Sequence, residues 1–311
     1  MDSALARLLV ILGPTASGKS ELAMRLAREL NGEVLACDST QVYRHFDIGT
    51  GKVPPAERRG IPHHLIDLVE PDDLFTAGEY AARATAVLAD VTSRGNLPIM
   101  TAGTGLYLRA LLEGLSDAPA RSEELRERLR RKARAQGVLH LHKLLARVDP
   151  EAAHRIAPRD TQKIIRALEM RVLAGKAVGD IHRAGRKPLA GYAITKIGLD
   201  PPRADLYQRI HARVERMIAS GWLEEVRRLI AQGVPPESKP FQFIGYAELR
   251  RHIEGQMPLE AAIRSIQQAT RNYAKRQLTW FRKEPRVRWL AGFGDEPSIA
   301  AEAVRLVRSA S

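Results

Sequence analysis

The stretch with the clearest chemistry reads Gly13-Pro14-Thr15-Ala16-Ser17-Gly18-Lys19-Ser20. It fits the pattern G-x-x-x-x-G-K-[ST], in which glycines let backbone N–H groups turn towards phosphate oxygens. Lys19 offers an ammonium group to the phosphates, and the Ser20 hydroxyl suits Mg²⁺. The sequence therefore predicts a phosphate loop with Ser20 as a metal ligand, and the identity of the polyphosphate is open at this point.

The residues around this loop predict the elements that hold it. An apolar run, Leu8 to Leu12, precedes the loop, and leucines at 22, 26 and 30 follow at helical spacing. A strand, a glycine-rich loop and a helix are the context in which the pattern forms a real site. We therefore predict a strand that ends at the loop and a helix that begins there.

Two further loops follow predicted strands. The strand Glu33 to Ala36 leads to Asp38, and the strand Leu97 to Thr101 leads to Thr104. In an open α/β sheet, ligands bind beyond the carboxyl ends of the strands. We therefore expect Asp38 and Thr104 to flank the phosphate loop, although an Asp before a Ser is also a common helix cap or turn residue.

Composition narrows the class of protein. The chain has 311 residues and a net charge of +13. This charge favours RNA or DNA as a partner over a membrane. The alternative explanation is that the protein comes from an organism whose proteins are generally basic. Its one cysteine, Cys37, excludes an intramolecular disulfide and a CxxC metal site. The apolar runs are of strand length, so we predict no membrane association and a cytoplasmic location.

The middle of the chain carries helical patterns without strand signals. We predict an all-helical insertion at residues 114–191, within an α/β core at 1–113 and 192–311 that has a P-loop NTPase-like parallel sheet. Gln162 and Arg166 lie four residues apart in this insertion, with Lys163 beside them.

A long helix is predicted from Pro258 to Phe281. Its apolar side is formed by Leu259, Ile263, Ile266, Thr270, Tyr273 and Trp280, and its basic side by Arg264, Arg271, Lys275 and Arg282. The basic side lacks interspersed acidic residues, so we interpret it as a stripe that follows nucleic-acid phosphates.

These pieces together resemble the bacterial tRNA dimethylallyltransferase family over nearly the whole chain. The matching blocks are Gly13 to Ser20, Asp38 to Tyr43, Asp47 to Thr50, Gly103 to Tyr107, Asp160 to Glu169, Ile244 to Tyr246 and Thr270 to Trp280. The last block is the most specific, because unrelated phosphate-loop proteins lack it. Ala102 and Thr40 depart from the residues that the family has more often at those places.

The resemblance implies transfer of a dimethylallyl group from its diphosphate to N6 of adenosine 37, with Mg²⁺, in tRNAs that read codons beginning with U. It implies a monomer that binds the tRNA anticodon stem-loop, with diphosphate in the Gly13–Ser20 loop. The catalytic residues would be Asp38, Thr104, Arg213 and Lys19. The tRNA-binding residues would be Asp38, Ser39, Thr40, Gln41, Thr104, Arg126, Gln162, Lys163, Ile164, Ile165, Arg166, Gln242, Phe243, Ile244, Gly245, Tyr246 and Ala247.

The residue chemistry agrees with that reaction. A carbon–oxygen bond breaks, so Lys19, backbone N–H groups, Mg²⁺ and Arg213 would stabilise the departing diphosphate. Asp38 is the candidate acceptor for the proton of the adenine amine. Three alternatives stay open: a phosphate-loop kinase of small molecules that uses ATP, an isopentenyltransferase acting on free AMP, and a non-enzymatic RNA-binding module. Whether a nucleoside triphosphate also enters the loop is likewise open.

Overall fold

The chain forms two compact units. The structure, a computed structural model, describes residues 5–309 apart from 117, 120 and 184–185. One unit contains residues 1–111 and 190–311, and the other contains residues 112–189. The boundaries fall two residues before the predicted ones at 113 and 191. Every helix in the described part of the chain is too short or too polar to cross a bilayer.

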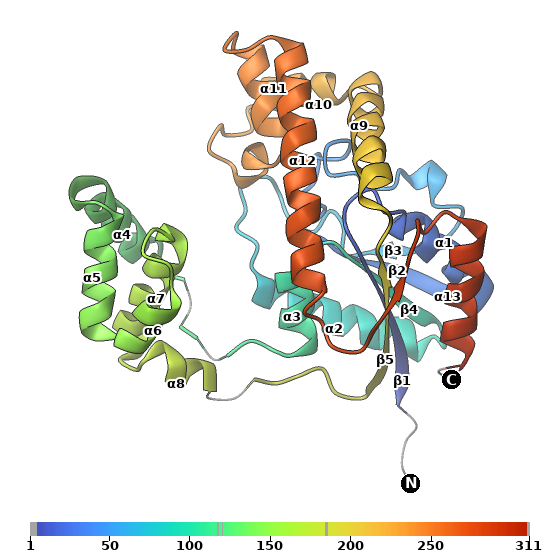
Figure 1. The fold of residues 1–311 in the computed structure, drawn as a ribbon, viewed down its shortest axis with the longest axis horizontal. Helices are drawn as coiled ribbons and strands as arrows, with labels where there is room; N and C mark the ends of the chain where they lie inside the picture. The colour runs from blue at the N-terminus through green and yellow to red at the C-terminus, as the bar shows by residue number, and fades with distance from the viewer. Residues whose placement is uncertain (1–4, 117, 120, 184–185, 310–311) are drawn as a thin grey trace. The chain divides into compact units, whose positions relative to one another are not determined.

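The larger unit is built on a six-stranded parallel sheet (Figure 1). The strands are β1 (Ala6–Leu12), β2 (Gly32–Cys37), β3 (His63–His64), β4 (Leu97–Ala102), β5 (Tyr192–Leu199) and β6 (Val287–Leu290). Their order is β3-β2-β4-β1-β5-β6, and each neighbouring pair is parallel. The predicted α/β class with a parallel, P-loop NTPase-like sheet is thereby confirmed.

The register of this sheet aligns the ends of three strands. Leu12 of β1 and Cys37 of β2 both pair with Ala102 of β4, so the three residues lie in one row. The next residue of each strand opens a loop, and these loops carry the phosphate-loop pattern, Asp38 and Thr104. Parallel pairing thus brings three stretches that are distant in sequence to one edge of the sheet.

Helices pack on the sheet and extend beyond it. In the larger unit they are α1 (Lys19–Leu30), α2 (Ala77–Ser93), α3 (Gly105–Leu112), α9 (Arg203–Ala219), α10 (Trp222–Ala231), α11 (Tyr246–Ile253), α12 (Leu259–Phe281) and α13 (Pro297–Ser309), with short 3-10 helices at Pro55–Glu57 and Lys239–Gln242. Helix α3 ends just inside the smaller unit, at Leu112.

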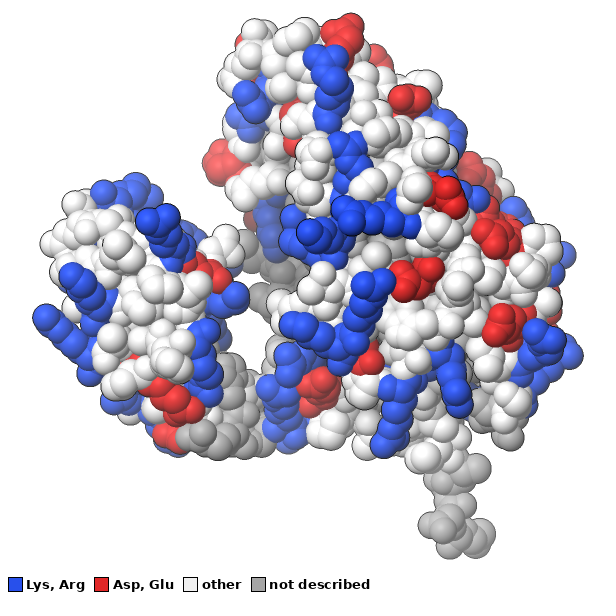
Figure 2. All heavy atoms as spheres, in the orientation of Figure 1, with Lys and Arg blue, Asp and Glu red and all other residues white. Residues whose placement is uncertain are grey.

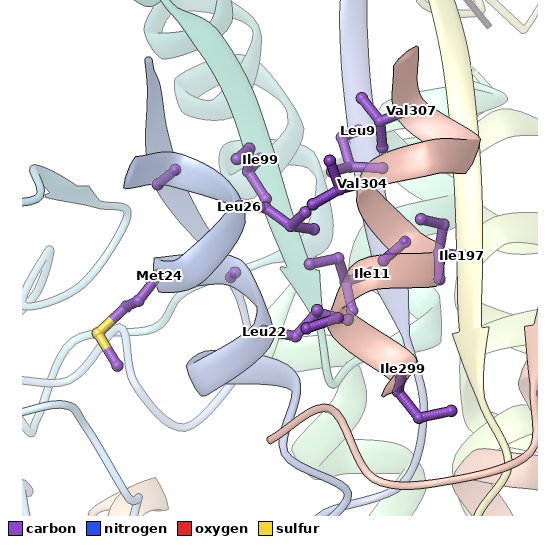
Figure 3. Packing of buried hydrophobic residues seen from close by; sticks show 14 of the residues in the cluster. Leu9, Ile11, Leu22, Met24, Leu26, Ile99, Ile197, Ile299, Val304 and Val307 are labelled. Atoms are coloured by element: carbon purple, nitrogen blue, oxygen red, sulfur yellow. The ribbon is translucent and has the colours of Figure 1, made fainter. Parts of the chain in front are cut away.

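One apolar cluster fixes the start of α1. Figure 3 shows Leu22 and Leu26 of α1 pointing towards Ile11 of β1 and towards Val304 of α13, and all these side chains are buried. Burying a leucine contributes on the order of 1.5–3 kcal/mol relative to exposure. The phosphate loop therefore lies between a buried strand and a helix whose apolar face is anchored over its length.

The smaller unit is helical in all the elements that its described residues form. These are α4 (Glu123–Gln136), α5 (Val138–Val148), α6 (Pro150–Arg155), α7 (Thr161–Ala174) and α8 (Val178–Arg183). It has a core of its own, which includes Leu141, Leu145, Ile164 and Ile165. Side-chain caps begin three of its helices: Ser122 on α4, Asp149 on α6 and Asp160 on α7.

Helix α12 buries a set of residues that differs from the predicted apolar side. Its buried residues are Ala262, Ile266, Ala274, Gln277 and Phe281. The prediction placed Trp280 on the packed side, but that indole is 41% exposed. The prediction followed apolar side chains and therefore chose Trp280. The buried side of the helix instead passes through the polar Gln277 and through Phe281, the residue after Trp280.

Candidate active site

The phosphate loop has the backbone conformation that an anion cradle needs. Gly18 has φ 85° and caps α1, and Ala16 also has a positive φ of 63°. A side chain at Gly18 would meet the backbone N of Gly294 at 2.8 Å, so glycine is needed for space as well as for conformation. Backbone N–H groups at the start of α1, together with the helix dipole, favour a bound anion.

The side chain of Lys19 folds back and contacts the phosphate loop. Its Nζ donates to the carbonyl oxygens of Gly13 at 2.9 Å and Pro14 at 2.7 Å. Burial lowers the pKa of Lys19 to about 7, the Asp38 carboxylate acts to raise this pKa, and Arg213 lowers it. An anion beside the ammonium group would favour its charged form and raise the pKa again.

Asp38 has one occupied and one free carboxylate oxygen. Its Oδ1 accepts hydrogen bonds from Thr40, at 2.8 Å from the backbone N–H and 2.7 Å from the hydroxyl. Its Oδ2 faces Gly103, where an added Cβ would lie only 2.4 Å away. Within the part of the chain that the structure describes, no donor reaches Oδ2. The carboxylate is thus fixed in orientation with an oxygen left to accept a proton.

Thr104 ties its loop to the loop that carries Asp38. The Thr104 hydroxyl accepts from the backbone N–H of Ser39 at 2.9 Å and donates to the Ser39 hydroxyl at 3.2 Å. The backbone N–H groups of Gly103 and Thr104 both donate to the Cys37 carbonyl at 3.0 Å. The two loops therefore form one connected wall beside the cradle.

Arg213 approaches the site from α9. A Cβ at Gly51 would lie 2.0 Å from Nη2 of Arg213, so the guanidinium passes directly over that turn. Burial lowers the pKa of Arg213 and Arg216 adds to this, whereas Asp38 raises it. The predicted catalytic residues Lys19, Asp38 and Arg213 are thus close enough to influence one another's charge.

Two buried polar residues of the site were missed from the sequence. Gln277 accepts from the Thr15 N–H at 2.7 Å and donates to the Gly103 carbonyl at 2.8 Å. Glu225, which is 1% exposed, accepts from the N–H groups of Asp47 and Ile48. A polar residue within a predicted apolar stripe is the signal that would have found Gln277.

The predicted RNA-binding residues of the insertion divide into three kinds. Ile164 and Ile165 are 0% and 6% exposed, so their side chains belong to the insertion core, and their assignment as tRNA-binding residues stays a prediction. Arg126 and Arg166 both bind the buried carboxylate of Glu169. Burial would raise the pKa of Glu169, but the two arginines hold it at about 2. Gln162 and Lys163 are exposed, and Lys163 pairs with Asp160.

The predicted stretch from 242 to 247 also mixes exposed and buried residues. Gln242 is exposed, Phe243, Ile244 and Ala247 are half-buried, and Gly245 and Tyr246 are buried. The Tyr246 hydroxyl donates to Glu225 at 2.6 Å and accepts from the Gly49 N–H at 3.1 Å. Tyr246 therefore positions the loop at 47–49 through its hydroxyl, and its assignment as a tRNA-binding residue stays a prediction. Ser39, Thr40 and Gln41 are half-buried at the rim of the Asp38 loop.

The basic stripe of α12 is less uniform than predicted. Arg264 and Lys275 are exposed, whereas Arg271 is half-buried against Tyr207 and His211 of α9. Arg282 binds Asp200 at 2.9 Å, so one position of the stripe has an acidic partner. A neighbouring face of α12 forms an open groove of about 530 Å³, lined by Asn272, Lys275, Arg276, Thr279, Trp280 and Lys283. Figure 2 shows blue basic side chains over α12 with few acidic ones beside them.

Ser20 is the residue predicted to bind Mg²⁺. Among the described residues, no group of three His, Cys, Asp or Glu side chains could hold a metal by itself. Mg²⁺ commonly binds through one or two protein oxygens together with substrate phosphates and water. Ser20 is exposed at the first turn of α1, and it also lines a small pocket of about 20 Å³ with Gln41 and Thr101, which has room for about one water.

Comparisons with known proteins agree with this geometry. The family model "IPP transferase" matches residues 41–284. A tRNA dimethylallyltransferase of Solibacter usitatus is 50% identical over 96% of this chain and 96% of its own length, and one of Koribacter versatilis is 48% identical over 97% and 98%. The crystal structure of the tRNA isopentenylpyrophosphate transferase of Bacillus halodurans is 36% identical, with a TM-score of 0.72 over 98% of this chain and 96% of that one. The chain therefore belongs to the tRNA dimethylallyltransferase (IPP transferase) family.

Proposed function

We propose that this protein transfers the dimethylallyl group of dimethylallyl diphosphate to N6 of adenosine 37 in tRNAs that read codons beginning with U, and releases diphosphate. The observation that carries the proposal is the row Leu12, Cys37 and Ala102, from which three loops bring an anion cradle and the free Oδ2 of Asp38 to one edge of the sheet. A diphosphate donor and a weakly acidic amine acceptor need those two features side by side.

The donor side stabilises the charge of the leaving diphosphate. Lys19, the N–H groups at the start of α1 and the Arg213 guanidinium would surround that charge, and both basic residues are half-buried. Bound Mg²⁺, held by the Ser20 hydroxyl, would supply further positive charge on the diphosphate oxygens. These groups act more strongly as the carbon–oxygen bond breaks, because negative charge grows on the leaving oxygen.

The acceptor side handles one proton. As the bond forms between N6 and the donor carbon, the amine nitrogen becomes acidic and its proton passes to Oδ2 of Asp38. The pair of electrons from the broken carbon–oxygen bond leaves on diphosphate, so the transfer balances without an oxidant or a further phosphate donor. Thr104 fixes the loop that carries Asp38 through its hydrogen bonds to Ser39.

The anticodon stem-loop is the partner that suits the exposed basic residues. Lys275, Arg276 and Lys283 line the α12 groove beside the exposed Trp280, a combination that suits a phosphate backbone and an unstacked base. Gln162 and Lys163 of the insertion would add contacts to the same RNA. The target base must leave its stack to reach Asp38. We further propose that the protein acts as a monomer in the cytoplasm.

One assay separates this function from its alternatives. The protein is incubated with labelled dimethylallyl diphosphate and Mg²⁺ together with tRNA or with free AMP, and separately with labelled ATP and small-molecule acceptors. We expect label in tRNA alone. Label in AMP would support the free-nucleotide prenyltransferase, a phosphorylated product would support the kinase, and tRNA binding without any product would support the RNA-binding module.

A further inference from the structure

Gln277 joins the phosphate loop to the Thr104 loop through both ends of its amide. Its Oε1 accepts from the Thr15 N–H at 2.7 Å, and its Nε2 donates to the Gly103 carbonyl at 2.8 Å. The side chain is 6% exposed, so bulk water does not compete for these bonds. A neutral amide can accept at one end and donate at the other, which no charged side chain of this length can do.

Each end of the Gln277 side chain bonds a loop that carries a residue of the proposed reaction. Thr15 belongs to the loop over which Lys19 folds, and Gly103 lies against the free Oδ2 of Asp38. The Tyr273 hydroxyl, one turn earlier on α12, supports the same Gly103 carbonyl at 3.2 Å. Gln277 therefore connects the donor cradle to the wall that carries the proton acceptor, through bonds made within one unit of the chain.

We propose that Gln277 is a positioning residue that sets the spacing between the diphosphate cradle and Asp38. This rests on the proposed prenyl transfer, in which donor carbon and amine must meet at bonding geometry. The bridge acts on the rate of transfer more than on affinity, because Gln277 takes up the Thr15 N–H and leaves Lys19 and the N–H groups at the start of α1 to the diphosphate. Misplacing reacting groups by about 1 Å can cost on the order of 10²-fold in rate.

The test is the variant Gln277→Glu. It keeps the length of the side chain and the acceptor for Thr15, but it places a second oxygen against the Gly103 carbonyl. We expect the single-turnover rate at pH 8 to fall by about 10²-fold. The affinity for tRNA should change little, and the affinity for dimethylallyl diphosphate should change little in Gln277→Met, which adds no charge beside the cradle. At lower pH the rate relative to the unaltered protein should recover, because burial raises the pKa of a carboxyl group and the protonated acid can donate to Gly103 again.

Two further variants make the result decisive. Gln267→Glu adds the same charge on α12 at a half-buried position, where the side chain hydrogen-bonds Glu215 at 3.4 Å, and it should keep the original rate at every pH. Gln277→Met removes both bonds without adding charge, so its rate should fall with no recovery at low pH. It also decides the question if the Glu variant does not fold.

Three outcomes would overturn the positioning role while the unaltered protein makes prenylated tRNA. These are an unchanged rate in Gln277→Glu or Gln277→Met, a loss in Gln277→Glu that is the same at every pH, and a loss fully explained by weaker donor or tRNA binding. If the unaltered protein makes no prenylated tRNA, both the proposed function and this role are overturned.

Discussion

Nζ of Lys19 lies 2.7 Å from the carbonyl oxygen of Pro14, so the lysine is bound to the loop whose ligand it would neutralise. Burial lowers the pKa of Lys19 to about 7, and a diphosphate beside it would raise that pKa. At pH 8 the free protein then holds fewer protons at Lys19 than the complex does. We predict uptake of up to about one proton when dimethylallyl diphosphate binds at pH 8, and an affinity that falls as the pH rises above 7.

Titration calorimetry in buffers of different ionisation enthalpy measures this uptake. The donor is nearly fully ionised at pH 8, because the last pKa of a phosphate group is about 6. Lys19→Ala should remove the uptake and weaken use of the donor far more than it weakens tRNA binding. Uptake that persists in Lys19→Ala would show that another group takes the proton.

Asp38→Asn tests the proton acceptor. The amide keeps the shape of the side chain, and its oxygen can still accept from Thr40 as Oδ1 does. It cannot take a proton from the adenine amine. We expect turnover to fall by about 10²–10⁴-fold, the usual contribution of a general base, with tRNA affinity nearly kept. A collapse of affinity with normal single-turnover chemistry would instead make Asp38 a binding residue.

The parallel sheet and the phosphate loop were predictable because both follow from local patterns. An apolar run, a glycine-rich stretch and leucines at helical spacing are neighbours in the chain, and they fixed the strand, loop and helix at residues 6–30. The meeting of Asp38 with the cradle was inferred from the parallel arrangement of the strands. The register then places Cys37 and Leu12 opposite the same residue, Ala102.

The contacts between distant segments were not predictable in this way. Gln277 bonds to Thr15 and Gly103, and Glu225 bonds to Asp47 and Ile48, all more than 170 residues away in sequence, so local patterns do not reveal these partners. The resemblance to a family indicated which continuous stretches bind tRNA, but not which side chains within each stretch face the RNA. It therefore grouped the buried Ile164 and Ile165 with the exposed Gln162. Helical periodicity directs the two isoleucine side chains towards the insertion core.

Burial on α7 predicts different effects for two residues that lie close together in sequence. Ile164→Ala should lower the free energy of unfolding by about 2–5 kcal/mol, because it empties space in a buried core. Gln162→Ala should leave stability within about 0.5 kcal/mol and weaken tRNA binding. Denaturant unfolding and filter binding measure the two quantities. A stable Ile164→Ala protein with weakened tRNA binding would contradict this expectation and support the isoleucine as an RNA contact.

The α12 groove predicts a graded salt dependence. Lys275→Ala and Lys283→Ala should each reduce the slope of log affinity for tRNA against log salt concentration by roughly 0.7–0.9, the value of one lost phosphate contact. Arg305→Ala on α13 is the matched control, because it removes an exposed charge away from the groove. Slopes that stay unchanged in both lysine variants would show that this face does not follow the RNA backbone.

The central claim is that the cradle holds the donor as a diphosphate and that the nucleobase is the acceptor. The most direct measurement is mass spectrometry of nucleosides from tRNA treated with the protein, Mg²⁺ and dimethylallyl diphosphate, with and without ATP. We predict N6-dimethylallyladenosine in equal amount in both reactions. Replacing adenosine 37 by guanosine should abolish it, because guanosine presents O6 where the amine must be. An absolute requirement for ATP, or a phosphorylated product, would contradict the account.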